Sequence, residues 1–347
     1  MSLPQNKNSM ANYRRKPFEV FYRNFLILFV SCFSFVKGNA SGREICPQAN
    51  AVKTITKTIY HQGIKRIYHI YLPSNFNREM PAPMIIALHG GGGKGSKFET
   101  GTTNGTLTAA ADKQGVVLVF PEGMNKHWND GRTEIFKKKK AYDDVAFISK
   151  VIDAMIQYYH IDSQRIYATG ISNGGFMAIR LALELPEKIA AIAPVAAQLT
   201  KALENKKPVL PVSIMMLNGT LDPLVPFAGG SIKVFKFSKS RGEVLSVAAT
   251  IEHFKEYNKC KMPLEKKLVP DKVADDGTRI EIQSYTTCEK ETEVISVKVI
   301  GGGHTWPGGK QYLKPRWVGT VSREINASEM IVNFFLKHAR KKLTKRQ

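Results

Sequence analysis

The chain has 347 residues, with 51 Lys or Arg against 29 Asp or Glu, so its formal net charge at pH 7 is +22. Hydrophobic residues make up 43% of the chain, which is ample for a buried core. The basic residues are scattered and match no nucleic-acid-binding module, so we expect a solvated basic surface and no nucleic-acid partner.

Residues 1–40 have the composition of a signal peptide. Basic residues at 14–16 and 23 precede an apolar run at 25–36, and Gly38-Asn39-Ala40 supplies small residues for cleavage. We therefore expect cleavage near Ala40 and a mature, secreted or periplasmic protein of residues 41–347. The apolar run is too short for a stable membrane span; an uncleaved anchor and a lipoprotein attached at Cys32 are the alternatives.

After this leader, apolar runs alternate with segments of helical periodicity. Seven runs have the length of buried strands, at residues 67–72, 84–88, 116–120, 166–169, 189–194, 212–217 and 295–300. Helical periodicity occurs at residues 144–159, 176–183, 245–257 and 327–338. The alternation predicts the α/β class, with a mostly parallel sheet and helices on both faces. We expect one domain over residues 41–347, ending in a short basic tail.

The segment Gly170-Ile171-Ser172-Asn173-Gly174 follows the apolar run at 166–169. Gly-x-Ser-x-Gly between a strand and a helix is the nucleophile elbow of the α/β-hydrolases, in which glycines avoid collisions at a tight turn. Ser172 is thus a candidate nucleophile. Because a chain with 27 Gly can produce this pentapeptide by chance, its partners decide the interpretation.

The partners occur in the order that such a catalytic triad requires, Ser then Asp then His. Asp222 follows the predicted strand at 212–217, and His304 follows the strand at 295–300 and three glycines. Both therefore belong at strand ends, where open α/β sheets place functional groups. The sequence predicts Ser172 as nucleophile, His304 as general base and then acid, and Asp222 as the residue that orients the imidazole.

The strand at 84–88 runs into His89-Gly90-Gly91-Gly92-Gly93, a His-Gly-Gly-Gly motif of the kind that lipases and esterases use for the oxyanion. We expect the backbone N–H groups of Gly91 and Asn173 to form the oxyanion hole.

The same loop has a rival interpretation. Gly90, Gly92 and Gly95 also satisfy Gly-x-Gly-x-x-Gly, and Glu122 follows the next strand, as in a dinucleotide site. That fingerprint needs a helix that opens within the glycines, whereas helical periodicity here begins only near Leu107. We therefore favour the oxyanion loop. Metal sites are unsupported, because the histidines lack ligand spacing and no Cys-x-x-Cys occurs.

Seven motifs spread over most of the chain occur at residues 88–92, 121–123, 128–132, 143–145, 169–175, 222–230 and 302–309. Together they resemble the secreted esterases grouped as polyhydroxybutyrate depolymerase-like proteins, relatives of the feruloyl and acetylxylan esterases of carbohydrate esterase family 1. The last motif is the most specific and selects His304 among the histidines. One departure is the run Lys137–Lys140, where the family usually has a short variable loop.

The resemblance implies the α/β-hydrolase fold and a Ser-His-Asp esterase without a metal or organic cofactor. The leading substrate is polyhydroxyalkanoate (3-hydroxybutyrate) polymer or its oligomers. A feruloyl or acetyl ester of plant polysaccharide is the enzymatic alternative. An inactive binding protein on a hydrolase scaffold is the alternative of another class.

Three aromatic residues, Trp128, Trp306 and Tyr312, are candidates for a wall beside the ester. Core packing is an equal alternative for Trp128. The polar residues within 129–132 are expected to hold their own loop in place.

The cysteines and a basic cluster give two further expectations. Cys260 and Cys288 flank a predicted strand pair late in the chain, and we expect a disulfide between them, as the resemblance also supports. Cys46 is then left single in the mature protein. The cluster Lys137–Lys140 is hypothesised to favour acidic substrates or envelope surfaces.

Overall fold

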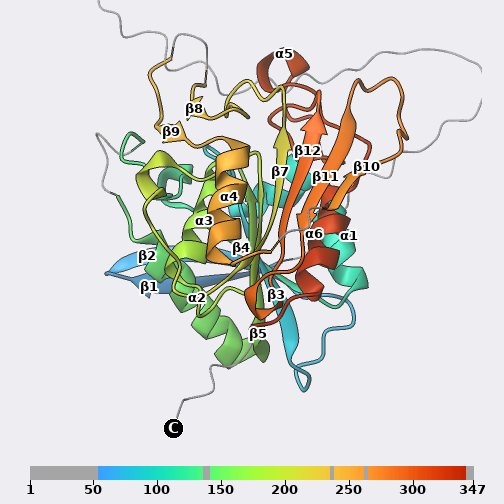
Figure 1. Ribbon diagram of the computed structural model, residues 1–347. Helices are drawn as coiled ribbons and strands as arrows, with labels where there is room; N and C mark the ends of the chain where they lie inside the picture. Colours follow the sequence, from blue (N-terminus) through green and yellow to red (C-terminus); the bar gives the residue numbers. More distant parts are fainter. Residues whose placement is uncertain (1–53, 136–140, 235–237, 262–264, 341–347) are drawn as a thin grey trace, which may run out of the picture. The chain divides into compact units, whose positions relative to one another are not determined.

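A computed structural model describes residues 54–340, except 136–140, 235–237 and 262–264 (Figure 1). The predicted signal peptide, Cys46 and Lys137–Lys140 lie outside the described residues. The described residues all belong to one compact unit, Gln48–Gln347. No helix among residues 54–340, apart from those gaps, is long and apolar enough to cross a membrane.

The centre of this unit is a ten-stranded sheet in the order β1-β2-β4-β3-β5-β6-β7-β12-β11-β10. Its strands are β1 Ile55–His61, β2 Ile64–Tyr71, β3 Ala82–Leu88, β4 Val117–Pro121, β5 Ile161–Ile171, β6 Ala191–Val195, β7 Ser213–Gly219, β10 Glu265–Leu268, β11 Arg279–Tyr285 and β12 Val294–Ile300. A separate hairpin pairs β8 Gly230–Ser231 with β9 Glu243–Val244.

The middle of the sheet is parallel and its margins are antiparallel. Strands β4, β3, β5, β6, β7 and β12 pair in parallel. The β1–β2 hairpin joins β4 in antiparallel register, and β11 and β10 extend the other margin in the same way. The mostly parallel sheet predicted from the sequence is thus confirmed, and β10–β11 is the strand pair expected between the two cysteines.

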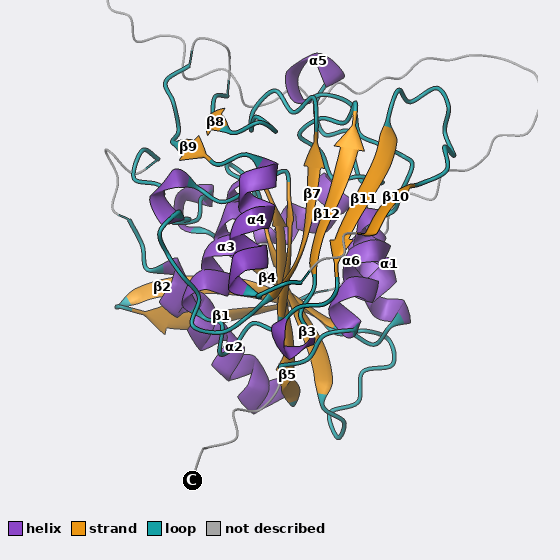
Figure 2. Ribbon diagram, viewed as in Figure 1, coloured by secondary structure: helices purple, strands orange, loops and turns teal. Residues whose placement is uncertain are grey.

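The described part of the chain contains six α-helices, namely α1 Thr106–Lys113, α2 Asp144–Tyr159, α3 Asn173–Glu184, α4 Val247–Tyr257, α5 Pro315–Val318 and α6 Ala327–Leu336. Short 3₁₀ turns occur at η1 Gly95–Lys97, η3 Met124–Lys126, η4 Lys201–Leu203 and η5 Glu289–Glu291, and a π turn at η2 Glu99–Thr103. Helices α2, α3 and α4 cover one face, while α1 and α6 cover the other (Figure 2).

Strand β3 shows why the central strands have continuous apolar sequences. Met84, Ile86 and Leu88 pack into the core under α2 and α3, whereas Ile85 and Ala87 pack into the core under α1 and α6. Because both faces of a parallel sheet are covered, every position of such a strand must be apolar. The carboxyl ends of the parallel strands consequently meet at one edge, where the functional groups predicted from the sequence lie.

The disulfide Cys260–Cys288 is present. It joins the segment that follows α4 to the segment that follows β11. It encloses β10 and β11 within a loop whose ends are 28 residues apart in sequence. Closing such a loop should stabilise the fold by about 3–4 kcal/mol through the entropy of the unfolded chain.

Candidate active site

Ser172 lies on the sharp turn between β5 and α3. Its backbone has φ 55° and ψ −122°, a conformation that residues other than glycine rarely adopt. The Ser172 N–H donates to the Val195 carbonyl at 2.9 Å, and the Ser172 carbonyl accepts from Phe176 N–H at 2.8 Å. These bonds hold the strained turn in place, so the Gly-x-Ser-x-Gly motif occupies a strand-to-helix turn as expected.

The glycines on either side of Ser172 allow this turn to press against the end of β3. A Cβ atom on Gly170 would lie 2.5 Å from the Leu88 carbonyl oxygen, and one on Gly174 would overlap the same oxygen. Any larger residue would therefore push the elbow away from β3. The close approach brings the loop after β3 next to Ser172, since a Cβ on Gly90 would lie 3.8 Å from the Ser172 Cβ.

His304 and Asp222 form a buried pair at the ends of β12 and β7. His304 Nδ1 lies 2.6 Å from Asp222 Oδ2, and both side chains are almost inaccessible to solvent. The other carboxylate oxygen accepts hydrogen bonds from the N–H groups of Leu224 and Val225, each at 2.8 Å. The carboxylate is therefore fixed by its own turn and points at the imidazole, which is the geometry of an orienting acid.

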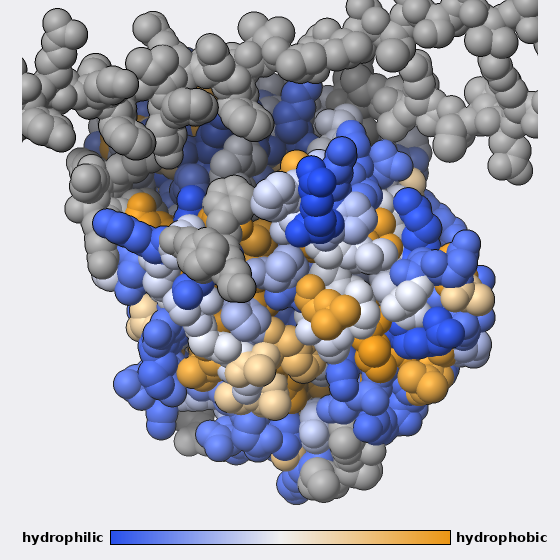
Figure 3. All heavy atoms as spheres, turned by 90° about the horizontal axis from the view of Figure 1, so that it is seen from above, coloured by the Kyte–Doolittle hydropathy of each residue, from blue (hydrophilic) through white to orange (hydrophobic). Residues whose placement is uncertain are grey.

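Ser172 and His304 line the same cavity, whose volume is about 420 Å³. Gly91 and Asn173 line it as well, so the four residues predicted for nucleophile, base and oxyanion hole meet at one place. Figure 3 views the molecule from the end toward which the arrows of β7 and β12 point in Figure 1. Apolar and strongly hydrophilic residues are interspersed on this face.

The backbone near Ser172 offers two N–H groups to a bound anion. Asn173 is the first residue of α3, and a Cβ on Gly91 would lie 3.7 Å from the Asn173 Cβ. Neither N–H donates a hydrogen bond to another described residue. The dipole of α3 adds a positive potential at the same point. The arrangement is suited to the oxyanion of a tetrahedral intermediate.

Two polar residues fix the glycine loop that carries Gly91. His89 Nδ1 lies 2.8 Å from the Gly90 carbonyl, and His89 Nε2 accepts from Gly123 N–H at 3.0 Å. Burial lowers the pKa of His89, which keeps the ring neutral and able to accept. Glu122 accepts from the N–H groups of Gly95 and Ser96.

Burial of Glu122 opposes its ionisation, but hydrogen bonds from His69, Ser96 and Gly95 prevail and lower its pKa to about 2. Glu122, which occupies the position of the acidic residue in a dinucleotide-binding fingerprint, thus anchors the glycine loop. In addition, α1 begins at Thr106, well after the glycines, so the loop does not open a helix as that fingerprint requires.

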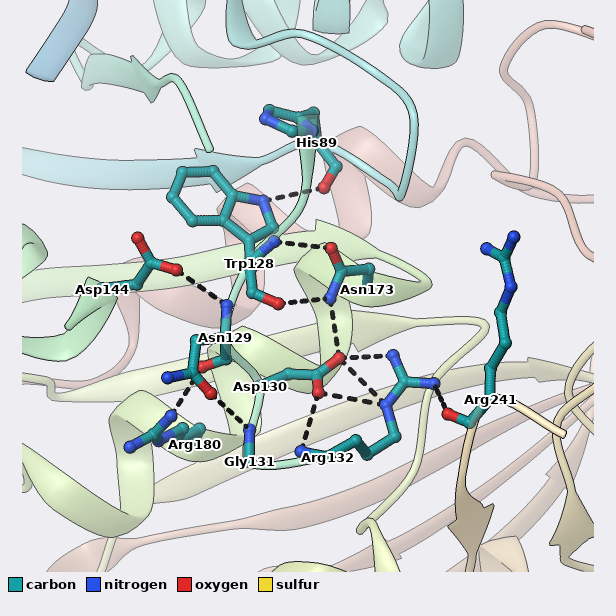
Figure 4. A network of polar contacts seen from close by, with 10 residues as sticks. All are labelled: His89, Trp128, Asn129, Asp130, Gly131, Arg132, Asp144, Asn173, Arg180 and Arg241. Carbon is teal, nitrogen blue, oxygen red and sulfur yellow. Dashed lines mark hydrogen bonds and ion pairs between the residues drawn. The ribbon is translucent and has the colours of Figure 1, made fainter. Parts of the chain in front are cut away.

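The side chain of Asn173 is held by a buried network, drawn in Figure 4. It donates to the Trp128 carbonyl at 3.0 Å and to Asp130 at 2.7 Å, and it accepts from Trp128 N–H at 2.8 Å. Asp130 in turn forms an ion pair with Arg132. The polar residues of 129–132 thus hold their own loop, as predicted, and they also fix the start of α3.

The proposed aromatic wall needs correction. Trp128 and Trp306 each have an exposed fraction of 0%, and neither lines the cavity. Each indole N–H is satisfied inside the protein, Trp128 by the His89 carbonyl and Trp306 by the Ser328 hydroxyl. The prediction that these two side chains face the ester is wrong, because their large apolar rings gain more from core packing. Tyr312 does line the cavity, and its hydroxyl donates to the His304 carbonyl at 2.9 Å.

Several side chains of the cavity were not found from the sequence. They are mostly apolar and come from α3, the turn after Asp222 and the β8–β9 hairpin: Phe176, Leu224, Val225, Ile232 and Val234. Two basic residues of the hairpin segment, Lys233 and Arg241, accompany them. No local sequence pattern predicts that these residues line the cavity. They come together only when the β8–β9 hairpin folds next to the turn that carries Ser172.

Comparison with known proteins identifies esterases among the similar sequences. A family model described as "Putative esterase" matches residues 63–224. The chain is 30% identical to "Putative esterase NocK" of Nocardia uniformis subsp. tsuyamanensis over 84% of either chain. It is 29% identical to feruloyl esterase B of Piromyces equi over 70% of this chain, but it spans only 43% of that protein.

Solved structures share the fold at low sequence identity. A thermostable esterase superimposes with a TM-score of 0.52 at 15% identity, over 83% of this chain and 63% of that one. An acetyl xylan esterase from Aspergillus awamori gives a TM-score of 0.50 at 13% identity, over 72% of this chain and 94% of that one. The α/β-hydrolase fold predicted from the sequence is thus confirmed.

The family match and the similar proteins identify the chain as a carboxylic ester hydrolase. The chain belongs to an esterase family, and it is also similar to proteins named feruloyl and acetylxylan esterases.

Proposed function

We propose that the chain is a serine esterase in which Ser172, His304 and Asp222 act as a catalytic triad. The observation that carries this proposal is the buried His304–Asp222 pair beside a cavity that Ser172 also lines. An imidazole held by a carboxylate at Nδ1 leaves Nε2 to accept a proton, as a general base requires.

In the first half-reaction, Ser172 Oγ attacks the ester carbonyl carbon while its proton passes to His304. The carbonyl oxygen becomes an oxyanion held by the N–H groups of Gly91 and Asn173. The ester C–O bond then breaks, and His304 returns the proton to the leaving alcohol. Water repeats the sequence on the acyl-serine, which releases the acid and restores Ser172.

The leading substrate class is 3-hydroxybutyrate oligomers or the related polymer, on the basis of the motif resemblance and a cavity with many apolar side chains. Feruloyl or acetyl esters of polysaccharide are the second candidate, favoured by relatives named as feruloyl and acetylxylan esterases. Export after cleavage near Ala40 is part of the same proposal, on the basis of the basic and apolar pattern of residues 1–40.

The test is hydrolysis by the purified protein and its Ser172→Ala variant, on 3-hydroxybutyrate oligomers and methyl ferulate in parallel. Ser172-dependent turnover of the oligomers supports the leading substrate, and preference for the ferulate transfers the proposal to polysaccharide esters. Failure of a fluorophosphonate to label Ser172 would overturn the triad and favour an inactive binding protein.

A further inference from the structure

The cavity has an uneven charge. Five basic side chains line it, and no Asp or Glu is among the described residues that do so; the basic residues are Lys94, Lys97, Arg132, Lys233 and Arg241. Lys94, Lys97, Lys233 and Arg241 are exposed, so they present a positive potential to solvent beside the apolar walls, and this potential attracts anions to the cavity.

Among the described residues, one of the five cations has a carboxylate partner and four have none. Arg132 is buried and forms an ion pair with Asp130, and its guanidinium also donates to the Arg241 carbonyl at 2.9 Å. The other four have no carboxylate within ion-pair distance among residues 54–340 as described. In Figure 4 the guanidinium of Arg241 extends away from the Asp130–Arg132 pair.

These four cations come from two separate segments. Lys94 and Lys97 lie in the segment that continues from the oxyanion loop into η1. Lys233 and Arg241 lie between β8 and β9, where Arg241 N–H donates to the Ile232 carbonyl at 2.9 Å. Ile232 itself is buried in a small core with Phe176 and Val225. The backbone of the hairpin is thus anchored against the nucleophile helix, which holds its cations at the cavity.

We propose that the cavity selects esters that carry a free carboxylate close to the ester bond. This inference rests on the proposed esterase function and names the substrate class of the same site. Apolar walls would accept the carbon chain, while cations from one or both segments would bind the carboxylate. Attraction between opposite charges is strengthened where one side of the contact has a low dielectric constant.

Two kinds of ester share this chemistry. In a short hydroxy-acid oligomer with a free end, the leaving alcohol carries the carboxylate. In a half-ester of a dicarboxylic acid, the acyl group that is transferred to Ser172 carries it. The bonds broken and formed are those of the proposed mechanism in either case, so the carboxylate acts only in binding and orientation.

The experiment compares matched pairs of esters. For the acyl side, kcat/KM is measured on mono-(4-nitrophenyl) adipate and on 4-nitrophenyl hexanoate. For the alcohol side, the linear 3-hydroxybutyrate trimer is compared with its terminal carboxamide. We expect the charged member to be preferred in at least one pair, and its advantage to shrink when NaCl rises from about 25 mM to about 500 mM.

Two double variants test which cations bind the carboxylate. The first combines Lys94→Gln with Lys97→Gln, and the second combines Lys233→Gln with Arg241→Gln. At least one should lower the charged-to-neutral ratio of kcat/KM by about tenfold. The matched control is Lys57→Gln with Lys65→Gln on the β1–β2 hairpin, where both lysines are exposed and lie outside the cavity. This control should leave the ratio unchanged.

The outcomes separate the two proposals. If the neutral esters are turned over in a Ser172-dependent way but no charged ester is preferred, the carboxylate proposal is wrong and the esterase proposal stands. A preference that neither cavity variant reduces would also overturn it. If no ester is turned over and Ser172 resists fluorophosphonate labelling, the function itself fails.

Discussion

His304 Nδ1 lies 2.6 Å from Asp222 Oδ2, although 82 residues separate the two in sequence. Strands β7 and β12 are parallel neighbours in the sheet, so their carboxyl ends deliver the two loops to the same point. The pairing is therefore set by the sheet, and the turn at Asp222 fixes the orientation of the carboxylate.

Replacing Asp222 with Asn should abolish most activity and leave the fold intact. The amide would no longer hold the imidazole in the tautomer that accepts a proton at Nε2, so kcat should fall about ten-thousand-fold with little change in KM. The measurement is steady-state hydrolysis of 4-nitrophenyl hexanoate. Asp275→Asn, at an exposed position, serves as the control. A decrease of less than tenfold would remove Asp222 from the triad.

Replacing Gly174 with Ala should destabilise the protein by about 3 kcal/mol or more, because the new methyl group would overlap the Leu88 carbonyl and force the elbow from β3. Gly101→Ala is the matched control, since a Cβ there meets nothing within 4 Å. Urea denaturation would give both free energies of unfolding. Equal stability of the two variants would contradict the close packing of the elbow.

Glu122 should make stability depend on pH in the acid range. Its folded pKa of about 2 lies below its ordinary value of 4.5, so the stabilisation is complete above about pH 4.5 and disappears as pH falls toward 2. Because 21% of the Glu122 side chain is exposed to solvent, which screens its interactions, we expect a contribution of only about 1–2 kcal/mol. Wild type should exceed Glu122→Gln by this amount at pH 7, and the difference should vanish near pH 2.

His89 should also make the stability of the fold decrease as pH falls, but in a higher pH range than Glu122. Burial lowers its folded pKa below 6.5, so the unfolded chain binds a proton more readily and stability falls as pH drops below about 6.5. Protonation would also remove the acceptor for Gly123 N–H and loosen the glycine loop. Titration of the imidazole by NMR gives the pKa directly, and a value at or above 6.5 would show that the ring is not protected in this way.

Replacing Cys260 and Cys288 together with Ser should lower the free energy of unfolding by about 3–4 kcal/mol. Activity at 25 °C should persist, because the disulfide encloses β10 and β11 and neither cysteine lines the cavity. Calorimetry of the variant provides the measurement. Detection of both thiols in free form, by mass spectrometry of the unreduced wild-type protein, would contradict the disulfide.

Local sequence patterns were sufficient to predict many of the helices and strands and the positions of the candidate triad residues. Helix α2 begins and ends at the predicted residues, 144 and 159, because an Asp cap at 143 precedes a regular apolar stripe. The expected positions of Ser172, Asp222 and His304 at strand ends hold, since each depends on a buried strand followed by glycines or a turn. Strand β1 was missed, because most of its residues are exposed and it has no buried apolar run.

Tertiary structure alone decided which side chains surround the site. An indole next to a loop motif can point into the core or into the cavity with the same sequence, and packing placed Trp128 and Trp306 in the core. The basic residues at 94–97 and 233–241 are distant in sequence and have no shared pattern. They become one feature only because the oxyanion loop and the β8–β9 hairpin line the same cavity above the elbow.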